Sequence, residues 1–141
     1  MKKTLFFLFA LLFVNSVIAQ NNTTAGKVHR IVFQLMSDDT TVHLSLMKQL
    51  NNVLTAAPDT KLEVVCHGPG INLLMNEKTT MLKKIREMKA KNVLFLVCEN
   101  TLKDKNIPKE KIIPEAGFVQ SGIIEIVTRQ EEGWSYIKSG F

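Results

Sequence analysis

The chain has 141 residues, 45% of them hydrophobic, and a formal net charge of +5 at neutral pH. This length is typical of one domain that builds its own hydrophobic core. Its two cysteines form no Cys-x-x-Cys motif and have no zinc-finger spacing to a histidine. We therefore expect no structural metal and no cofactor.

The N-terminal segment, residues 1–19, is predicted to be a secretory signal peptide. Two lysines precede an apolar run from Leu5 to Val14, and Val17 and Ala19 have the small-residue spacing that signal peptidase accepts. The alternative is a membrane anchor, but the run is short for a bilayer-spanning helix. We expect cleavage near Ala19, a secreted or periplasmic protein, and no membrane contact after cleavage.

After cleavage, residues 20–26 would form a short disordered lead-in and residues 27–141 a single domain. Loss of Lys2 and Lys3 reduces the 18 basic residues to 16, against 13 acidic residues, so the net charge falls to +3. Basic residues gather between positions 78 and 91 without interleaved aromatic residues, which is typical of a solvated helix face. No nucleic-acid partner is expected.

The first predicted strand covers residues 28–36, which are rich in apolar and β-branched side chains. A helix over residues 39–57 follows, because its apolar residues recur at helical spacing and Pro58 ends the pattern. Asp38 and Asp39 are interpreted as a helix cap, since an acidic pair without further partners is a poor metal site.

A second strand is predicted at residues 61–66, followed by the turn-forming sequence His67-Gly68-Pro69-Gly70. Such a segment leaves backbone N–H groups free to bind an anion, although it also makes an ordinary loop. Gly68 and Gly70 are therefore candidate ligand-binding residues.

The central feature of the sequence is the apolar run from Val93 to Cys98, which continues into the polar residues Glu99, Asn100 and Thr101. A run of this length indicates a strand covered on both faces and followed by the first turn of a helix. Cys98 would then lie at the carboxyl end of a parallel strand and at a helix N-terminus, where unpaired N–H groups favour the thiolate. Cys98 is therefore the candidate reactive residue.

The other predicted elements complete an alternation of helices and strands. They are a helix from Thr79 or Thr80 to Ala90, a short helix at 100–106, a short strand at 116–119, a helix from Ser121 to Gly133 and an edge strand at 134–138. A strand is the competing assignment for residues 123–127, which are β-branched, but Gly133 at the C-cap position favours a helix. The alternation predicts an α/β sandwich with right-handed crossovers.

Three segments resemble the DsrE/DsrF-like family in its secreted bacterial branch. They are VVCHGPGI at residues 64–71, the strand with Cys-x-Asn-Thr-Leu at residues 93–102, and SGIIEIVTRQEEGWSYIK at residues 121–138. The resemblance implies a three-layer α/β/α sandwich with a mostly parallel sheet of about five strands. It also implies a homo-oligomer, either a trimer or a hexamer.

The resemblance further implies a sulfur-relay or thiol-redox function in which Cys98 carries persulfide and exchanges sulfur with a donor or acceptor protein. His67 is a candidate partner of the Cys98 thiolate if the two strands that they follow are neighbours. Asn100 and Thr101 would donate hydrogen bonds to a bound anion or persulfide. The export signal and the CENTL sequence differ from the cytosolic relay proteins, and one fold can serve more than one function.

Two alternatives remain open at this point. Cys66 and Cys98 would lie about 5 Å apart at the ends of adjacent parallel strands, within reach of a disulfide. Alternatively, Cys98 is a buried small hydrophobic residue in a non-catalytic oligomeric binding module, so whether the protein is an enzyme stays open. Trp134, Tyr136 and Phe141 on the final edge strand favour assembly in either case.

Overall fold

The computed structural model describes residues 28–140. The predicted signal peptide (residues 1–19) and the predicted lead-in (residues 20–26) lie outside these residues. Within residues 28–140, no helix combines the length and the apolar character needed to cross a bilayer.

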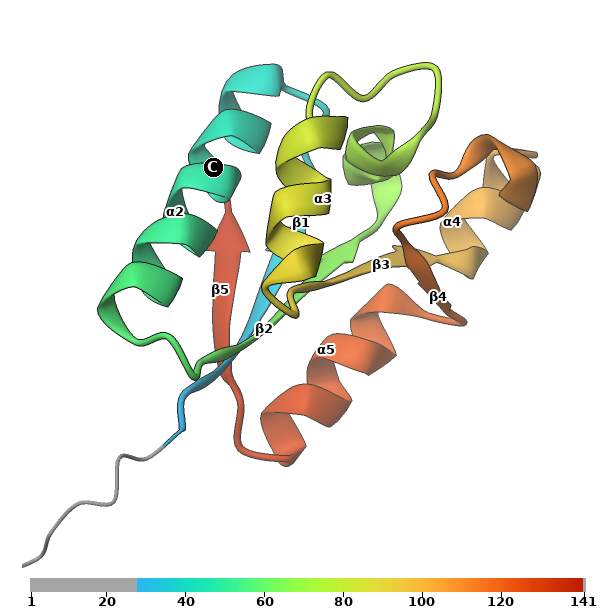
Figure 1. The fold of residues 1–141 in the computed structure, drawn as a ribbon. Coiled ribbons are helices and arrows are strands. Elements are labelled where there is room, and N and C mark those ends of the chain that lie inside the picture. The colour runs from blue at the N-terminus through green and yellow to red at the C-terminus, as the bar shows by residue number, and fades with distance from the viewer. Residues whose placement is uncertain (1–27, 141) are drawn as a thin grey trace, which may run out of the picture.

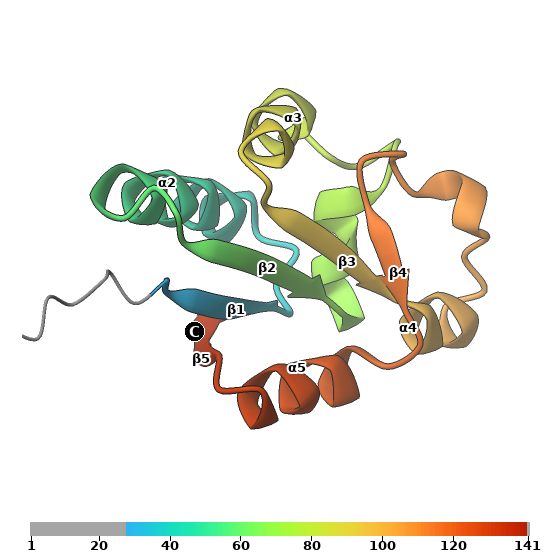
Figure 2. The same ribbon diagram turned by 60° about the horizontal axis from the view of Figure 1, so that its bottom comes forward.

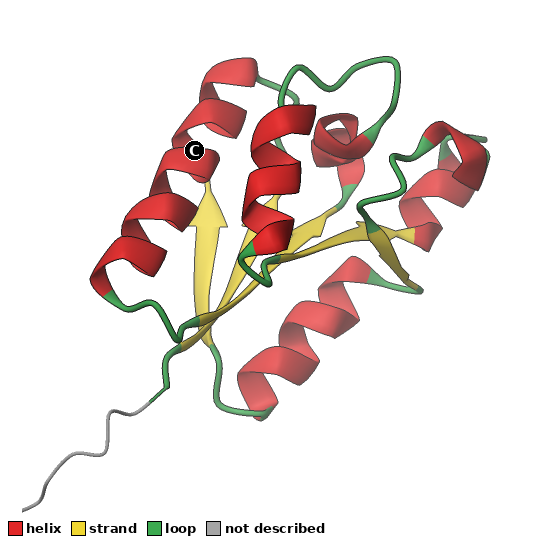
Figure 3. Ribbon diagram, viewed as in Figure 1, coloured by secondary structure: helices red, strands yellow, loops and turns green. Residues whose placement is uncertain are grey.

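Within the described residues, five parallel strands form one sheet (Figures 1 and 3). They are β1 (Arg30–Leu35), β2 (Lys61–Cys66), β3 (Leu94–Cys98), β4 (Gly117–Val119) and β5 (Ser135–Ser139). Their order across the sheet is β4-β3-β2-β1-β5, and each neighbouring pair is parallel. All the carboxyl ends therefore meet at one edge of the sheet, where β3 ends with Cys98.

Helices cover both faces of this sheet, which confirms the predicted three-layer α/β/α sandwich. They are α2 (Thr40–Ala56), α3 (Leu82–Ala90), α4 (Glu99–Asp104) and α5 (Gly122–Glu131), with the 3₁₀ helices η2 (Gly68–Leu74) and η3 (Lys109–Lys111). Helices α2 and α3 lie on one face and α5 lies on the other (Figure 2). From β1 to β4 the chain crosses the sheet in one direction, and the connection from β4 to β5 runs back. Right-handed crossovers then place α5 on the opposite face.

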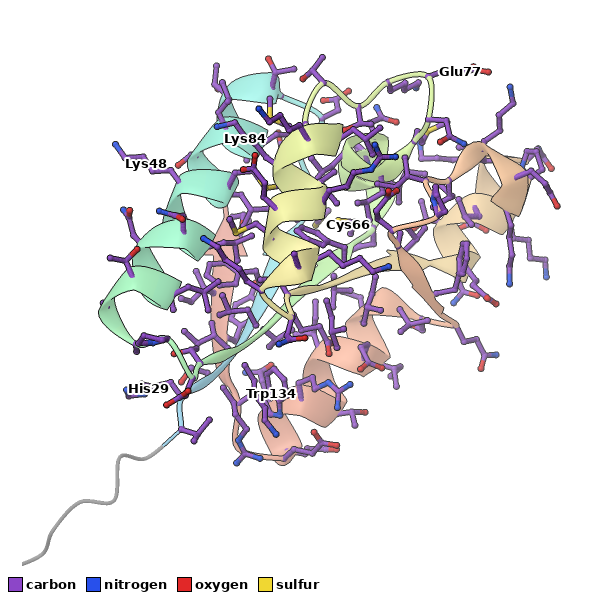
Figure 4. All side chains as sticks on the ribbon, viewed as in Figure 1. His29, Lys48, Cys66, Glu77, Lys84 and Trp134 are labelled. Carbon is purple, nitrogen blue, oxygen red and sulfur yellow. The ribbon has the colours of Figure 1, made fainter. Side chains whose placement is uncertain are left out.

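The two faces of the sheet carry cores of different size. The larger core lies under α2 and α3, and its sheet residues are Phe33, Leu35, Leu62, Val64, Cys66, Phe95 and Val97. The smaller core lies under α5 and consists of Val32, Val65 and Ile126, with Leu96 and Trp134 packed against it. Figure 4 shows Trp134 beside α5. The apolar contact between α5 and the sheet is therefore small.

Several local predictions are confirmed by the structure. Strand β3 ends at Cys98 and α4 begins at the next residue, as the apolar run indicated. Asp39 is the N-cap of α2, and its carboxylate accepts the N–H of Thr41 at 2.7 Å. Residues 123–127, for which a strand was the competing assignment, are helical and lie within α5.

Two local predictions need correction. The Gly-Pro-Gly segment is not an open loop, because it begins the 3₁₀ helix η2, in which Ile71, Leu73 and Leu74 are buried. Helix α3 begins at Leu82 instead of at the predicted cap, Thr79 or Thr80. The Thr79 hydroxyl accepts the N–H of Met81 at 3.2 Å, so it closes the turn that precedes the helix.

Candidate functional site

Cys98 lies at the carboxyl edge of the sheet and points towards α5. It is the last residue of β3 and the N-cap of α4, and it pairs in register with Val119 of β4. Leu96, two residues earlier, packs in the small core under α5. Side chains alternate along a strand, so Leu96 and Cys98 share this face. The thiol is therefore placed between the end of β3 and the start of α5.

The start of α5 contacts the thiol through Gly122. The backbone N–H of Gly122 donates a hydrogen bond to Cys98 Sγ at 3.2 Å. A Cβ at position 122 would lie 3.3 Å from Cys98 Cβ and 3.1 Å from a methyl carbon of Val65, both tighter than ordinary packing. A glycine thus allows this approach without displacing its neighbours. The approach leaves Cys98 only 5% exposed.

The first turn of α4 supplies further polar groups that act on Cys98. The Thr101 hydroxyl accepts the N–H of Gly68 at 3.1 Å, which leaves its own proton free to donate. That hydroxyl and the N–H groups of Asn100 and Thr101 favour the Cys98 thiolate and so act to lower the pKa of the thiol. Donors from two helices therefore surround one sulfur atom.

Burial and hydrogen bonding have opposite effects on the pKa of Cys98. Burial by itself raises the pKa, because apolar surroundings disfavour the thiolate. The hydrogen bonds from Gly122, Thr101 and Asn100 stabilise the thiolate and outweigh burial, so the pKa lies below its ordinary value. Cys98 is thus buried in a polar setting that favours ionisation, which distinguishes it from an ordinary core cysteine.

His67 lies against the same helix start but hydrogen-bonds in another direction. A Cβ at position 122 would lie 3.3 Å from His67 Cβ, the same distance as from Cys98 Cβ. His67 Nε2 lies 2.6 Å from Gln34 Nε2, and Gln34 Oε1 accepts the hydroxyl of Tyr136. With Gln34 in this orientation its amide donates, so His67 Nε2 accepts and the ring is neutral. Burial also lowers the pKa of His67. Its hydrogen-bond partner is therefore Gln34 and not the Cys98 thiolate.

Gly68 and Gly70 use their N–H groups inside the protein. Gly68 donates to the Thr101 hydroxyl, and Gly70 donates to the His67 carbonyl at 3.0 Å. A Cβ on Gly70 would lie 2.1 Å from the carbonyl oxygen of Leu35, so this glycine allows η2 to pack against β1. In the structure the two glycines serve packing and contact Thr101, and a ligand-binding role for them stays a prediction.

Cys66 faces away from Cys98. It pairs in register with Val97, whose side chain points to the face opposite that of Cys98. Cys66 is fully buried in the core under α2 and α3, and Figure 4 shows it on the side of α3. Burial raises the pKa of its thiol. Both cysteines are free, so the candidate disulfide is wrong because the two strand ends present their sulfur atoms to different faces.

Two open hollows adjoin the start of α4. One, of about 320 Å³, is lined by Asn100, Val119, Gln120, Ser121, Ile124 and Glu125. The other, of about 460 Å³, extends along α4 to Lys109 and is also lined by Asn100. The smaller hollow is lined by Val119, the register partner of Cys98, but Cys98 itself lines neither hollow. In the described part of the chain, no three His, Cys, Asp or Glu side chains are grouped as metal ligands.

Three residues of the site could not be chosen from the sequence alone. Gly122 is a weak signal of a functional site. A glycine in a helix lowers its stability, so its presence in the first turn suggests that the backbone must approach another group closely. Gln34 is a polar residue between buried apolar residues of a strand, which is a weak signal of the same kind. Tyr136 carries no such signal, since its meeting with Gln34 depends on β1 and β5 being neighbours.

Comparison with known proteins agrees with the fold. A family model described as the DsrE/DsrF-like family matches residues 11–139. No curated protein matches the chain.

Two solved structures of proteins of unknown function share the fold. MTH1491 from Methanobacterium thermoautotrophicum is 30% identical with a TM-score of 0.75, and the match covers 78% of this chain and 98% of that chain. BT1422 from Bacteroides thetaiotaomicron is 12% identical with a TM-score of 0.63, and the match covers 77% of this chain and 93% of that chain. At this identity the second likeness concerns the fold alone.

Proposed function

Because this chain belongs to the DsrE/DsrF-like family, we propose that it is a sulfur-handling protein whose reactive group is the Cys98 thiol. The family is generally related to sulfur relay. One observation carries the proposal for this chain: the Gly122 N–H donates to Cys98 Sγ, in a setting that lowers the pKa of the thiol. The thiolate is the nucleophilic form of cysteine, so this setting supports transfer chemistry.

In the proposed reaction, the Cys98 thiolate attacks the outer sulfur of a donor persulfide. A sulfur–sulfur bond forms to Cys98 Sγ, the donor's own sulfur–sulfur bond breaks, and the donor thiolate leaves with the electron pair. The outer sulfur keeps its proton and becomes the end of a Cys98 persulfide, so no oxidant is needed. Attack by an acceptor thiolate on this outer sulfur reverses the step and restores the Cys98 thiolate.

The surrounding groups have separate roles in this reaction. Gly122 and Thr101 hold the thiolate by donating hydrogen bonds, and they would hold the inner sulfur of the persulfide in the same way. Asn100 and Ser121 line the hollow through which the donor or acceptor sulfur would enter. The neutral His67 adds no positive charge beside the thiolate, so hydrogen bonds replace an imidazolium as its stabilising partner.

The proposal is tested by loading the protein with glutathione persulfide and mapping the added sulfur by mass spectrometry. We expect one extra sulfur atom on Cys98 that is lost after incubation with an excess of a low-molecular-weight thiol. Cys66→Ala should load normally and Cys98→Ser should not load. Absence of sulfur on Cys98, or equal loading of Cys98→Ser, would contradict the proposal.

A second part of the proposal is assembly into a homo-oligomer, a trimer or a hexamer, that meets a sulfur-donor or sulfur-acceptor protein. Helix α5 exposes Ile123, Ile124 and Val127, which are 52%, 62% and 41% exposed. Apolar side chains grouped on one helix usually mark a contact surface. Sedimentation should show an assembly that Ile124→Lys dissociates. A wild-type monomer at all concentrations would exclude this part and leave the thiol chemistry untouched.

A further inference from the structure

Glu63 is a carboxylate buried under α5, in the middle of the central strand. Its side chain has no exposed surface, which is rare for a glutamate. In register it lies between Val32 of β1 and Leu94 of β3, both apolar and on the same face. The charged groups that face it come from α5, namely Arg129 and Glu125.

Glu63 forms one ion pair, with Arg129, whereas Arg129 forms ion pairs with three glutamates. Arg129 Nε lies 2.9 Å from Glu63 Oε2, while Glu63 Oε1 has no hydrogen-bond partner. Arg129 also pairs with Glu125 at 2.8 Å and with Glu132 at 3.0 Å, both within or next to α5. Arg129 therefore stays paired whatever the charge of Glu63. An ionised Glu63 depends on Arg129 alone.

The same helix connects this ion pair to the thiol. Helix α5 runs from Gly122, which donates to Cys98 Sγ, past Arg129, which contacts Glu63. The apolar attachment of α5 is small, with Ile126 as its one buried apolar side chain in the described structure. A change in the charge of Glu63 can therefore act, through this one helix, on the hydrogen bond between Gly122 and Cys98.

We propose that Glu63 is a positioning residue for Cys98: with Arg129 it forms a proton-operated clamp that holds α5 on the sheet when Glu63 is protonated and loosens it when Glu63 ionises. Loosening of α5 withdraws the Gly122 N–H and opens the buried thiol to reactants. The clamp itself is independent of the proposed function, and only its consequence for sulfur transfer at Cys98 rests on that function.

The direction of the switch follows from linkage between protonation and conformation. Burial raises the pKa of Glu63 to about 7, and the Arg129 charge only partly opposes this. A loosened α5 would admit water and return Glu63 towards the ordinary pKa of 4.5. The packed state binds the proton more tightly, so ionisation favours the loosened state by up to about two orders of magnitude in population.

The test follows Trp134, the only tryptophan of the chain, whose ring lies 5.2 Å from Arg129 Cζ. Its fluorescence and the hydrogen exchange of α5 amides, corrected for intrinsic exchange, are measured from about pH 5 to about pH 9. In wild type we expect a transition near pH 7, with faster exchange of α5 above it. Alkylation of Cys98, normalised to its thiolate fraction, should accelerate over the same range.

Variants separate Glu63 from its neighbours. In Glu63→Gln the transition should disappear and alkylation should stay slow, because a neutral side chain keeps α5 packed. Glu63→Met is also neutral and of similar length, so it should give the same result as Glu63→Gln. It controls for any effect that is specific to the glutamine amide. The matched control is Glu132→Gln, which removes an exposed carboxylate from the same arginine and should keep the transition. Burial lowers the pKa of His67, so its ionisation falls at more acidic pH than that of Glu63.

The clamp is overturned if Glu63→Gln keeps the Trp134 transition of wild type, or if Glu132→Gln abolishes it. Cys98→Ser separates the clamp from the sulfur chemistry, because its Trp134 transition should match that of wild type. Failed persulfide loading with an intact Trp134 transition would contradict the proposed function and leave the clamp standing. Normal persulfide loading without the Trp134 transition would contradict the clamp and leave the proposed function standing.

Discussion

The N–H of Gly122 donates to Cys98 Sγ at 3.2 Å, which joins the first residue of α5 to the last residue of β3. A backbone donor cannot be removed by mutation of its own side chain, but it can be displaced. Its effect on the thiol is therefore tested best by adding atoms at position 122.

Gly122→Ala should make Cys98 less acidic. The new methyl group would meet Cys98 Cβ and a Val65 methyl carbon at 3.3 Å and 3.1 Å, so the start of α5 must shift away. Overpacking of this kind costs about 1–3 kcal/mol of stability. The pH profile of iodoacetamide alkylation should move to higher pH. Thr128→Ala is the control, because Thr128 is an exposed residue of the same helix and the profile should not move.

Thr101→Val should raise the pKa of Cys98 and lower stability together. Valine has the shape of threonine but neither donates to Cys98 nor accepts the N–H of Gly68. A buried donor left without a partner costs about 1–3 kcal/mol. Thr101→Ser keeps the hydroxyl and should retain the wild-type alkylation profile. If valine and serine gave the same profile, the hydroxyl would have no part in stabilising the thiolate.

Stability should fall as the pH rises through the range in which Glu63 ionises. The pKa of Glu63 is raised from 4.5 in the unfolded chain to about 7 in the fold, so the native state binds the proton more tightly. The free energy of unfolding should therefore decline between about pH 4.5 and about pH 7, by about 1–3 kcal/mol. Urea unfolding of Glu63→Gln at the two ends of this range should lack that part of the decline. An equal decline in the variant would show that other groups cause it.

Cys66 should remain unreactive while the protein is folded. Its side chain is fully buried and burial raises the pKa of its thiol, whereas hydrogen bonds lower that of Cys98. Titration with a thiol reagent under native conditions should count one thiol, at Cys98, and two after unfolding in denaturant. Cys66→Ala should cost about 1–2 kcal/mol through the small cavity that it leaves. Two fast thiols in the native protein would contradict the structure.

Much of the architecture could be predicted from the sequence. The strand that ends at Cys98, the helix that follows it and the helix over residues 123–127 were each predicted correctly, because periodicity, β-branching and capping residues act locally. The family resemblance supplied the layer arrangement. The partners that the N–H groups of Gly68 and Gly70 find within the fold could not be predicted, because they depend on tertiary contacts.

The sequence by itself determined the order of helices and strands and the position of Cys98 between a strand and a helix, because these depend on neighbours along the chain. Only the tertiary structure decided what surrounds the thiol. Alternation across paired strands turned Cys66 away from Cys98, and the return of the chain from β4 to β5 brought Gly122 to the sulfur and Arg129 to Glu63. Such meetings depend on strand order and register, which arise from packing of the whole sheet and leave no local pattern in the sequence.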